Sequence, residues 1–193
     1  MKKIKILIPV YNDWESLNKL LNEINFVIEK FDHIEFHCIV INDASTISCP
    51  EIKMPPKIKS LEIIDMEKNQ GHARCIAFGI RHLSQREDFD YLILMDGDGE
   101  DRPEEIKLLV EKAFTHKNTS IVAKRIKRSE GVFFKTLYEL HKLLTLIFTG
   151  KKVNFGNYSC LTRKDIKNLA NQKSLWSSFS GSVKFHISQL ETI

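Results

Sequence analysis

A cluster of acidic side chains follows a short apolar segment near the middle of the chain. Residues 91–95 read Tyr-Leu-Ile-Leu-Met, and Asp96, Asp98 and Glu100 follow, separated by single glycines. Side chains two positions apart on an extended backbone point the same way, so Asp96 and Asp98 can converge on one cation. Carboxylate oxygens are hard ligands that favour Mg²⁺, Mn²⁺ or Ca²⁺. The cluster therefore predicts a site for a divalent metal and for the phosphate groups that such a metal binds.

Two other interpretations of these acids need weighing. A calcium loop of the EF-hand type also begins Asp-x-Asp, but its sixth and twelfth positions are here Asp101 and Lys107 instead of glycine and glutamate. A solvated acidic turn, in which Asp101 caps a helix that begins at Pro103, stays open. The apolar segment before the acids favours the metal site, because open α/β sheets bind ligands at the carboxyl ends of their strands.

The hydrophobic pattern switches repeatedly between short apolar runs and helical spacing. The pattern predicts strands at 5–10, 35–41, 61–66, 91–95 and 121–123, and helices at 14–31, 73–83 and 103–114. Strands that alternate with helices indicate an α/β fold with a mostly parallel central sheet and helices on both faces. Residues 132–148 are apolar nearly all round, which favours packing on the core over a helix lying at a membrane interface.

Size and composition indicate a single intracellular domain. With 193 residues, 42% of them hydrophobic, the chain can bury one core. The formal charge is +4, but the basic residues are spread along the chain beside acids, so no nucleic-acid partner is indicated. The four cysteines show no Cys-x-x-Cys pairing, and no leader or apolar run of ~20 residues is evident. We expect one domain over 1–193, cytoplasmic and able to associate with the inner face of the membrane.

Polar residues follow each of the first four predicted strands and should open onto one edge of the sheet. Tyr11 and Asn12 follow the first strand, Asp43 the second, and Gly71 lies beyond the third. No Gly-x-Gly-x-x-Gly follows the first strand and the sequence contains no Walker loop, so the common dinucleotide and P-loop sites are excluded. Tyr11 can stack on a base, and Asp43 can accept hydrogen bonds from a base or ribose. Taken singly, Asn12 is explained as a helix cap and Asp43 and Gly71 as turn formers.

Four motifs, in this order and spacing, resemble those of a known family. They are Pro9-Val10-Tyr11-Asn12, Asn42-Asp43-Ala44-Ser45, Asn69-Gln70-Gly71 and Asp96-Gly97-Asp98. Together they resemble glycosyltransferase family 2, and within it the polyprenyl-phosphate sugar transferase branch. The resemblance covers Ile4 to Arg125 and extends weakly to Arg163. It implies a GT-A fold, the fold of nucleotide-diphospho-sugar transferases.

The resemblance implies a set of donor-binding residues. These are Pro9, Tyr11, Asn12, Asp43, Asn69, Gly71 and Asp96. Pro9, Tyr11 and Asn12 would line the nucleotide pocket. Asp43 would contact the base or the ribose, and Asn69 with Gly71 would shape the pocket floor.

The catalytic candidates are Asp98, Asp101 and Arg125. Asp96 and Asp98 would handle the diphosphate and an Mg²⁺ or Mn²⁺ ion, with Glu100 as an extra metal ligand where the branch often has Gln. Arg125 lies where the family often reads Gly-Ser-Arg and would clamp phosphate through bidentate donors. A solvated cation at a strand end explains Arg125 equally well. Asp101 or Glu100 would be the general base if the acceptor is a hydroxyl.

The sequence departs from the family pattern in three places. Asn42 replaces the commoner first Asp of its turn, and Asn157 replaces the acid of a Gly-Asp-Phe motif near the expected acceptor site. The chain also stops at Ile193, before a segment and membrane helices that are common in the branch. A phosphate acceptor, with a second pKa of about 6, is largely ionised at neutral pH and needs no general base, whereas a sugar hydroxyl does.

These observations predict a metal-dependent, inverting glycosyltransferase. Its donor would be a nucleoside-diphosphate sugar, with UDP favoured over GDP, and its acceptor polyprenyl phosphate at the membrane surface, in cell-envelope glycan synthesis. Three alternatives stay open: a catalytically silent nucleotide-sugar-binding or scaffold protein with the same fold, a nucleotidyltransferase, and a simple cation-binding module. The nucleotidyltransferase is disfavoured, because residues 9–13 lack a glycine-rich phosphate loop.

Overall fold

The computed structural model describes residues 1–117, 119–124 and 155–193. Two features singled out above, Arg125 and the apolar segment 132–148, lie outside the described residues. The strands are β1 Lys2–Val10, β2 Ile34–Asn42, β3 Ile58–Asp65, β4 Tyr91–Leu94, β5 Ser120–Lys124, β6 Phe155–Thr162 and β7 Leu190–Thr192. The helices are α1 Trp14–Ile28, α2 His72–Ser84, η1 Pro103–Glu105, α3 Ile106–Thr115, α5 Arg163–Ala170, η2 Lys173–Trp176 and α6 Phe179–His186, where η denotes a 3₁₀ helix.

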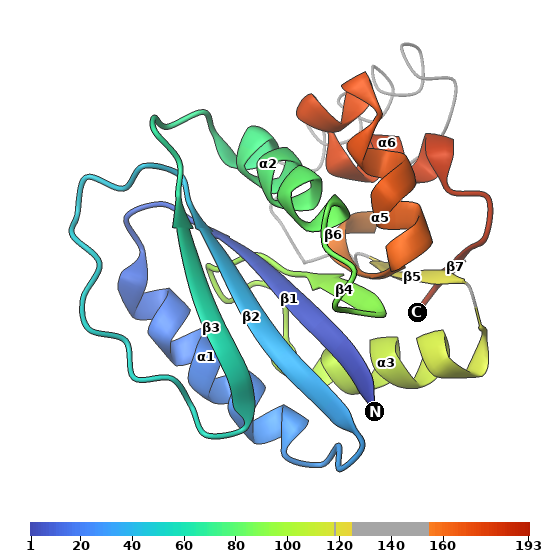
Figure 1. Ribbon diagram of the computed structural model, residues 1–193, viewed down its shortest axis with the longest axis horizontal. Helices are drawn as coiled ribbons and strands as arrows, with labels where there is room; N and C mark the ends of the chain where they lie inside the picture. Colours follow the sequence, from blue (N-terminus) through green and yellow to red (C-terminus); the bar gives the residue numbers. More distant parts are fainter. Residues whose placement is uncertain (118, 125–154) are drawn as a thin grey trace, which may run out of the picture.

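The described strands form one sheet in the order β3-β2-β1-β4-β6-β5-β7 (Figure 1). β1 pairs in parallel with β2 and β4, and β2 pairs in parallel with β3. β6 runs antiparallel to both of its neighbours, β4 and β5. The mostly parallel α/β sheet predicted from the sequence is therefore confirmed, with one strand inserted in the opposite direction.

Helices cover both faces of the sheet. The core on one face includes residues of α1 and α3, and the core on the other includes residues of α2, α5 and α6 (Figure 1). Side chains alternate along β1, so Ile6 and Ile8 join the first core while Leu7 joins the second. Because both faces are covered, every residue of β4 is buried, which explains its continuous apolar sequence.

Several elements differ from those predicted. The strand predicted at 61–66 is β3 and starts earlier, at Ile58. The helix predicted at 103–114 is divided into η1, with Pro103 in its first turn, and α3. The elements after 154, namely β6, α5, η2, α6 and β7, were not predicted. One of them, β6, borders the strand that carries the acids.

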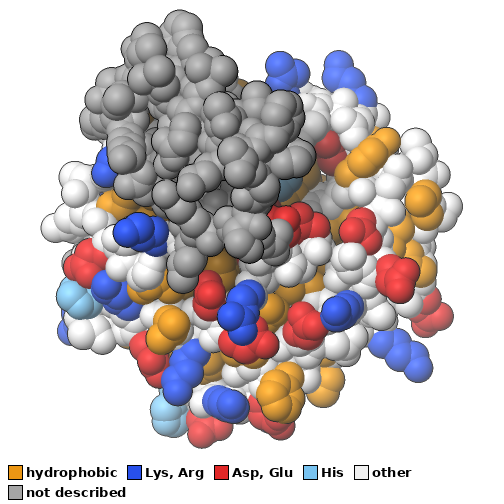
Figure 2. Space-filling model, turned by 180° about the vertical axis from the view of Figure 1, so that it is seen from behind, with side chains coloured by type: hydrophobic (Ala, Val, Ile, Leu, Met, Phe, Trp, Pro, Cys, Tyr) orange, Lys and Arg blue, Asp and Glu red, His pale blue; other side chains and the backbone are white. Residues whose placement is uncertain are grey.

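The described surface is of mixed charge. Figure 2 shows acidic and basic side chains interspersed, with scattered hydrophobic side chains between them. Phe26 and Leu108 are among the large hydrophobic side chains that are exposed. None of the described helices is long and apolar enough to cross a membrane.

Candidate active site

The parallel strands β1, β2 and β4 end at one side of the sheet, which we call the carboxyl edge. Val10 and Asn42, the last residues of β1 and β2, are partners in the sheet register. The acidic turn after β4 packs against the end of β1, because a Cβ on Gly97 would lie only 3.0 Å from the carbonyl oxygen of Pro9. The residues that follow the strands are thus brought together, as the sequence predicts.

Asn12 joins the loop after β1 to the loop after β2. Its backbone N–H donates to Ser45 Oγ at 2.8 Å, and its Oδ1 accepts from the N–H groups of Thr46 and Ile47 at 2.8 and 3.0 Å. The helix cap of α1 is Asp13, whose carboxylate accepts from the backbone of Ser16, so the helix-cap explanation of Asn12 is wrong. Asn12 therefore shapes the loops around the predicted nucleotide pocket.

Tyr11, Pro9 and Asn69 are placed differently with respect to solvent. Tyr11 is 47% exposed at the carboxyl edge, so it is accessible for stacking on a base. Pro9 is buried within β1, and its predicted place in the nucleotide pocket stays a prediction. Asn69 is exposed in the connection between β3 and α2.

Asp43 holds the turn that leads into α2. Its side chain is only 3% exposed, and its two carboxylate oxygens accept from the backbone N–H groups of Gln70 and Gly71 at 2.8 and 2.9 Å. Gly71 has a φ of +86°, a conformation that favours glycine, and it is the N-cap residue of α2. Asp43 and Gly71 thus act together in one turn, while a contact between Asp43 and a base or ribose stays a prediction.

Asn42 is bonded to an acid that sequence reasoning did not consider. Its Nδ2 donates to Asp65 Oδ1 at 2.7 Å, and its Oδ1 accepts from the N–H of Ser45 at 3.0 Å. An aspartate at position 42 would put two carboxylates in contact, which is unfavourable unless one of them is protonated. The departure from the family motif is therefore compensated locally by Asp65.

Two hydrogen bonds, each from a backbone N–H to a carboxylate of the same turn, hold the acidic turn. The N–H of Asp96 donates to Asp101 Oδ2 at 2.8 Å, and the N–H of Glu100 donates to Asp98 Oδ1 at 2.9 Å. Gly99 has a φ of +79°, which completes the turn. The N-cap residue of η1 is Arg102, without a side-chain cap bond, so Asp101 stabilises the turn and does not cap the helix.

The donor set at this turn fits a hard divalent cation only in part. Asp98 and Glu100 are exposed and Asp96 is half-buried, and all offer carboxylate oxygens. Among the described residues, however, no three His, Cys, Asp or Glu side chains are arranged to hold a metal ion. Asp96 and Asp98 therefore fit an ion whose remaining ligands are diphosphate oxygens and water, and a ligand role for Glu100 stays a prediction.

His72 and Asn157 contact Asp96. His72 Nε2 lies 3.2 Å from Asp96 Oδ1, and Asn157 Nδ2 lies 3.2 and 3.3 Å from the two carboxylate oxygens and 2.9 Å from His72 Nε2. The hydrogen bond to Asp96 raises the pKa of His72, against the opposing effect of burial. Sequence reasoning flagged Asn157 as a departure and missed His72, whose only signal was its place directly after Gly71.

Tyr158 anchors the acidic loop to β6. It is buried, and its hydroxyl donates to the carbonyl oxygen of Arg102 at 2.9 Å. Burial raises the pKa of this phenol, with the acids Asp101 and Glu105 adding to the effect. Tyr158 is therefore unsuited to act as a general base at neutral pH.

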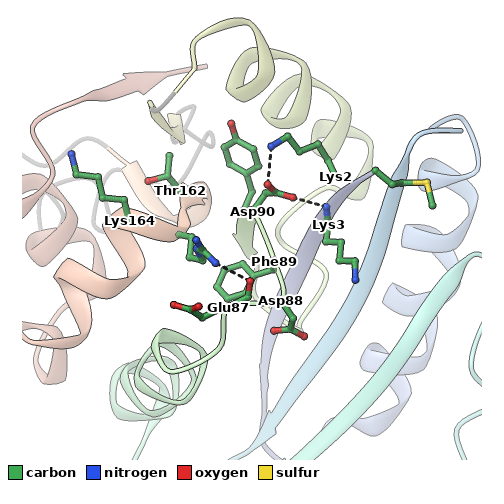
Figure 3. Close-up of a pocket in the computed structure, with 11 residues that line it drawn as sticks. Lys2, Lys3, Glu87, Asp88, Phe89, Asp90, Thr162 and Lys164 are labelled. Atoms are coloured by element: carbon green, nitrogen blue, oxygen red, sulfur yellow. Dashed lines mark hydrogen bonds and ion pairs between the residues drawn. The ribbon is translucent and has the colours of Figure 1, made fainter.

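A cavity of about 430 Å³ lies where the parallel strands begin, opposite the carboxyl edge (Figure 3). We call this end of the sheet the amino edge. Its charged lining is largely paired: Lys2 Nζ and the N–H of Lys3 both bond to Asp90, and Arg163 donates to the carbonyl oxygen of Glu87. The strands β1 and β4 begin here, whereas open α/β sheets bind ligands where parallel strands end. We therefore take the carboxyl edge, and not this cavity, as the candidate active site.

The fold and the carboxyl edge define a domain of the GT-A glycosyltransferase class, and comparison with known proteins supplies its family. Residues 5–177 match the model of a family described as Glycosyl transferase family 2, so the chain belongs to this family. The family and the GT-A fold predicted from the sequence are both confirmed.

Curated relatives carry related names. The chain is 30% identical, over 167 residues, to undecaprenyl-phosphate 4-deoxy-4-formamido-L-arabinose transferase of Salmonella choleraesuis (strain SC-B67). The match includes 84% of this chain and 48% of the relative. The chain thus spans about half the length of the curated relatives it matches.

Solved structures share the fold at low identity. S. aureus TarS 1–349 superposes with a TM-score of 0.62 and 18% identity, covering 100% of this chain and 58% of the 1–349 chain. TarS 1–349 was also solved with UDP and with UDP-GlcNAc. Glucosyl-3-phosphoglycerate synthase from Mycobacterium tuberculosis, in complex with Mn²⁺, UDP and glucosyl-3-phosphoglycerate, superposes with a TM-score of 0.57 and 12% identity. That match covers 84% of this chain and 57% of the synthase.

Proposed function

We propose that this domain transfers a sugar from a UDP-sugar to polyprenyl phosphate, with the help of Mg²⁺ or Mn²⁺. The observation that carries the proposal is the convergence of three strand ends at the carboxyl edge. There the loop ordered by Asn12, the turn held by Asp43 and the acids Asp96 and Asp98 lie together. This arrangement offers a base-stacking ring, an ordered turn and carboxylates at the ends of three neighbouring strands, β1, β2 and β4.

The donor assignment rests on the chemistry of the edge and on relatives. Tyr11 offers an exposed ring for the base, and Asp96 and Asp98 offer oxygen ligands near the diphosphate. UDP is favoured because TarS and the mycobacterial synthase were both solved with this nucleotide. Arg125 remains the proposed phosphate clamp.

The reaction we propose is a single displacement with inversion. An oxygen of the acceptor phosphate attacks the anomeric carbon, the bond from that carbon to the diphosphate oxygen breaks, and the electron pair leaves with UDP. A divalent cation, when bound, offsets the charge that builds on the diphosphate. Asp96 and Asp98 would hold this cation, while the turn fixed by Asp43 and the loop fixed by Asn12 would orient the nucleotide.

The acceptor assignment rests on the neutral side chain that contacts Asp96 and on the names of relatives. The side chain next to Asp96 on β6 is the neutral amide of Asn157. A phosphate with a second pKa of about 6 needs no proton removed at neutral pH, which suits such a site. The Salmonella relative is named for undecaprenyl phosphate, and an acceptor of this kind would bring the domain to the inner face of the membrane.

Binding calorimetry tests the donor half of the proposal. UDP and GDP would be titrated into the wild type and Asp98→Ala, with and without Mn²⁺. We expect Mn²⁺-dependent UDP binding that weakens at least about 10-fold in Asp98→Ala, because a metal ligand is lost. Asp32→Ala, which removes an exposed acid near the start of β2, is the matched control and should bind like the wild type. Lack of nucleotide binding by the wild type under every condition would overturn the proposal.

A transfer assay tests the acceptor half. Wild-type protein would receive UDP-sugars with undecaprenyl phosphate or, as a control, undecaprenol. Sugar transfer to the phosphate alone supports the proposal, and transfer to the alcohol alone would show that the acceptor is a hydroxyl. Binding of UDP without release or transfer of sugar from any donor would favour the catalytically silent alternative.

A further inference from the structure

Asp96 is contacted by side chains from two other elements of the fold. Asn157 on β6 donates from Nδ2 to both carboxylate oxygens, at 3.2 and 3.3 Å. His72, the first residue of α2, approaches Oδ1 at 3.2 Å and Asn157 Nδ2 at 2.9 Å. Three elements distant in sequence therefore meet at one carboxylate.

The contact from Asn157 restricts the orientation of the Asp96 carboxylate. Hydrogen bonds to an ionised acceptor are stronger than those between neutral groups, and two contacts from one donor atom oppose rotation of the carboxylate. An aspartate at position 157 would present acceptor oxygens to Asp96 and repel it. The neutral amide thus provides an attachment that the acid of the family motif would not provide.

Asp98 lies in a different environment. It is exposed at the apex of the turn, and its Oδ1 accepts from the N–H of Glu100 within the same turn. Asp96 is half-buried and attached to β6 and α2, whereas the described contact of Asp98 is local. The two carboxylates of the Asp-x-Asp motif are therefore not equivalent in this chain.

We propose that Asn157 and His72 are positioning residues that fix the carboxylate of Asp96 against β6, so that Asp98 makes the principal protein contact with the metal and diphosphate. The inference rests on the proposed function and adds two residues and a division of roles to it. Residues of this kind, one shell outside a metal, commonly change metal affinity 10- to 100-fold when they are replaced. Their effect must pass through Asp96.

The first test measures Mn²⁺ binding and not turnover. The affinity for Mn²⁺ would be measured by electron paramagnetic resonance at saturating UDP for the wild type, Asn157→Leu and His72→Leu. We expect each variant to bind Mn²⁺ about 10-fold more weakly or worse, with a free energy of urea unfolding close to that of the wild type. Asn22→Leu is the matched control, because that exposed amide bonds only to the carbonyl of Asn18 in its own helix.

A double-mutant cycle separates positioning from general damage. Asn157→Leu would be combined with Asp96→Ala, and the loss of Mn²⁺ affinity compared with that of Asp96→Ala alone. If Asn157 acts through Asp96, the second substitution changes the affinity less than about 2-fold. The inference is overturned if Asn157→Leu weakens Mn²⁺ binding as much in the Asp96→Ala background as in the wild type. It is also overturned if Asn157→Leu binds Mn²⁺ with wild-type affinity.

The outcomes also distinguish this inference from the proposed function. If the wild type binds Mn²⁺ with UDP and loses binding in Asp98→Ala, but Asn157→Leu and His72→Leu bind normally, only the positioning roles are wrong. If the wild type binds neither UDP nor Mn²⁺, the proposed function fails and the inference fails with it.

Discussion

Gly97 is the residue at which the acidic turn comes closest to its neighbouring strand. A Cβ there would lie 3.0 Å from the carbonyl oxygen of Pro9 and 3.3 Å from side-chain atoms of Ile8 and Val10. Because a backbone oxygen cannot move aside easily, we expect Gly97→Ala to cost about 1–3 kcal/mol of unfolding free energy. A shift of the turn away from Pro9 would also displace Asp96 and Asp98, the proposed metal ligands, so nucleotide binding should weaken as well.

Gly156 provides the comparison for this substitution. No atom lies within 4 Å of a Cβ built on it, and it lies on the neighbouring strand β6. In urea, the free energy of unfolding of Gly156→Ala should therefore be close to that of the wild type and well above that of Gly97→Ala. Equal stability of the two variants would mean that the turn is not packed as described.

The same scale shows what residue types alone can predict. Asp96 and Asp98 were identified because they follow a buried apolar strand, where open α/β sheets bind ligands, and because they match the Asp-x-Asp motif of the family. The partners of these acids were not identified, because Asn157 is 61 positions from Asp96 in sequence and pairs with it only through the fold. Asp65 was not predicted for the same reason, since its hydrogen bond with Asn42 joins residues 23 positions apart in sequence.

Asn12 links two loops, and it does so from a left-handed backbone conformation with a φ of 57°. Asn12→Gly keeps that conformation accessible but removes the bonds to Thr46 and Ile47. Asn12→Ala removes the bonds and also penalises the conformation by about 1 kcal/mol. We therefore expect Asn12→Ala to be the less stable variant, whereas alanine is usually the more stable where both residues fit.

Thermal and urea unfolding of the two Asn12 variants would measure this difference. Both variants should also bind UDP more weakly than the wild type, since the loops on either side of Tyr11 and Thr46 lose the hydrogen bonds made by the Asn12 side chain. If Asn12→Ala proved as stable as Asn12→Gly, the backbone at this position would not be held in the left-handed region.

At the scale of elements, the strands β1 to β5 were predicted from the sequence, whereas the antiparallel strand β6 and the short strand β7 were not. β1, β2 and β4 are buried because helices cover both faces of the sheet. Strands of this kind are recognised in a sequence as continuous apolar runs. β6 mixes polar and apolar residues, and its place follows from pairing with β4, in which Thr162 lies opposite Tyr91. The inserted strand carries Asn157 to the carboxyl edge, so without that strand the contact of Asn157 with Asp96 could not be predicted.

In the part of the molecule that the structure describes, the candidate active site lies at the carboxyl edge and the buried ion pair of Lys5 lies towards the amino edge. Near the amino edge, Lys5 is almost fully buried and bonds to both oxygens of Asp88 at 2.7 and 2.8 Å. Arg86 forms two bonds of 2.7 Å with Glu62 nearby, and these lower the pKa of that acid. The described partners of Asp96 at the carboxyl edge are Asn157 and His72, whereas Asp88 and Glu62 are paired with Lys5 and Arg86.

This division predicts how the protein responds to acid. Burial opposes the ionisation of Asp88, but the hydrogen bonds and charge of Lys5 outweigh it, so the pKa of Asp88 is lowered on folding. Such a group stabilises the fold above the unfolded value of about 4 and loses that effect as pH falls through the lower, folded value. We expect Asp88→Asn to cost about 1–3 kcal/mol at pH 7, because buried Lys5 loses its charged partner. Urea unfolding would be measured from pH 7 down to pH 3. The difference in unfolding free energy between Asp88→Asn and the wild type should disappear below pH 4, whereas Asp32→Asn should match the wild type at every pH. A difference that stays constant with pH would mean that the charge of Asp88 does not stabilise the amino edge.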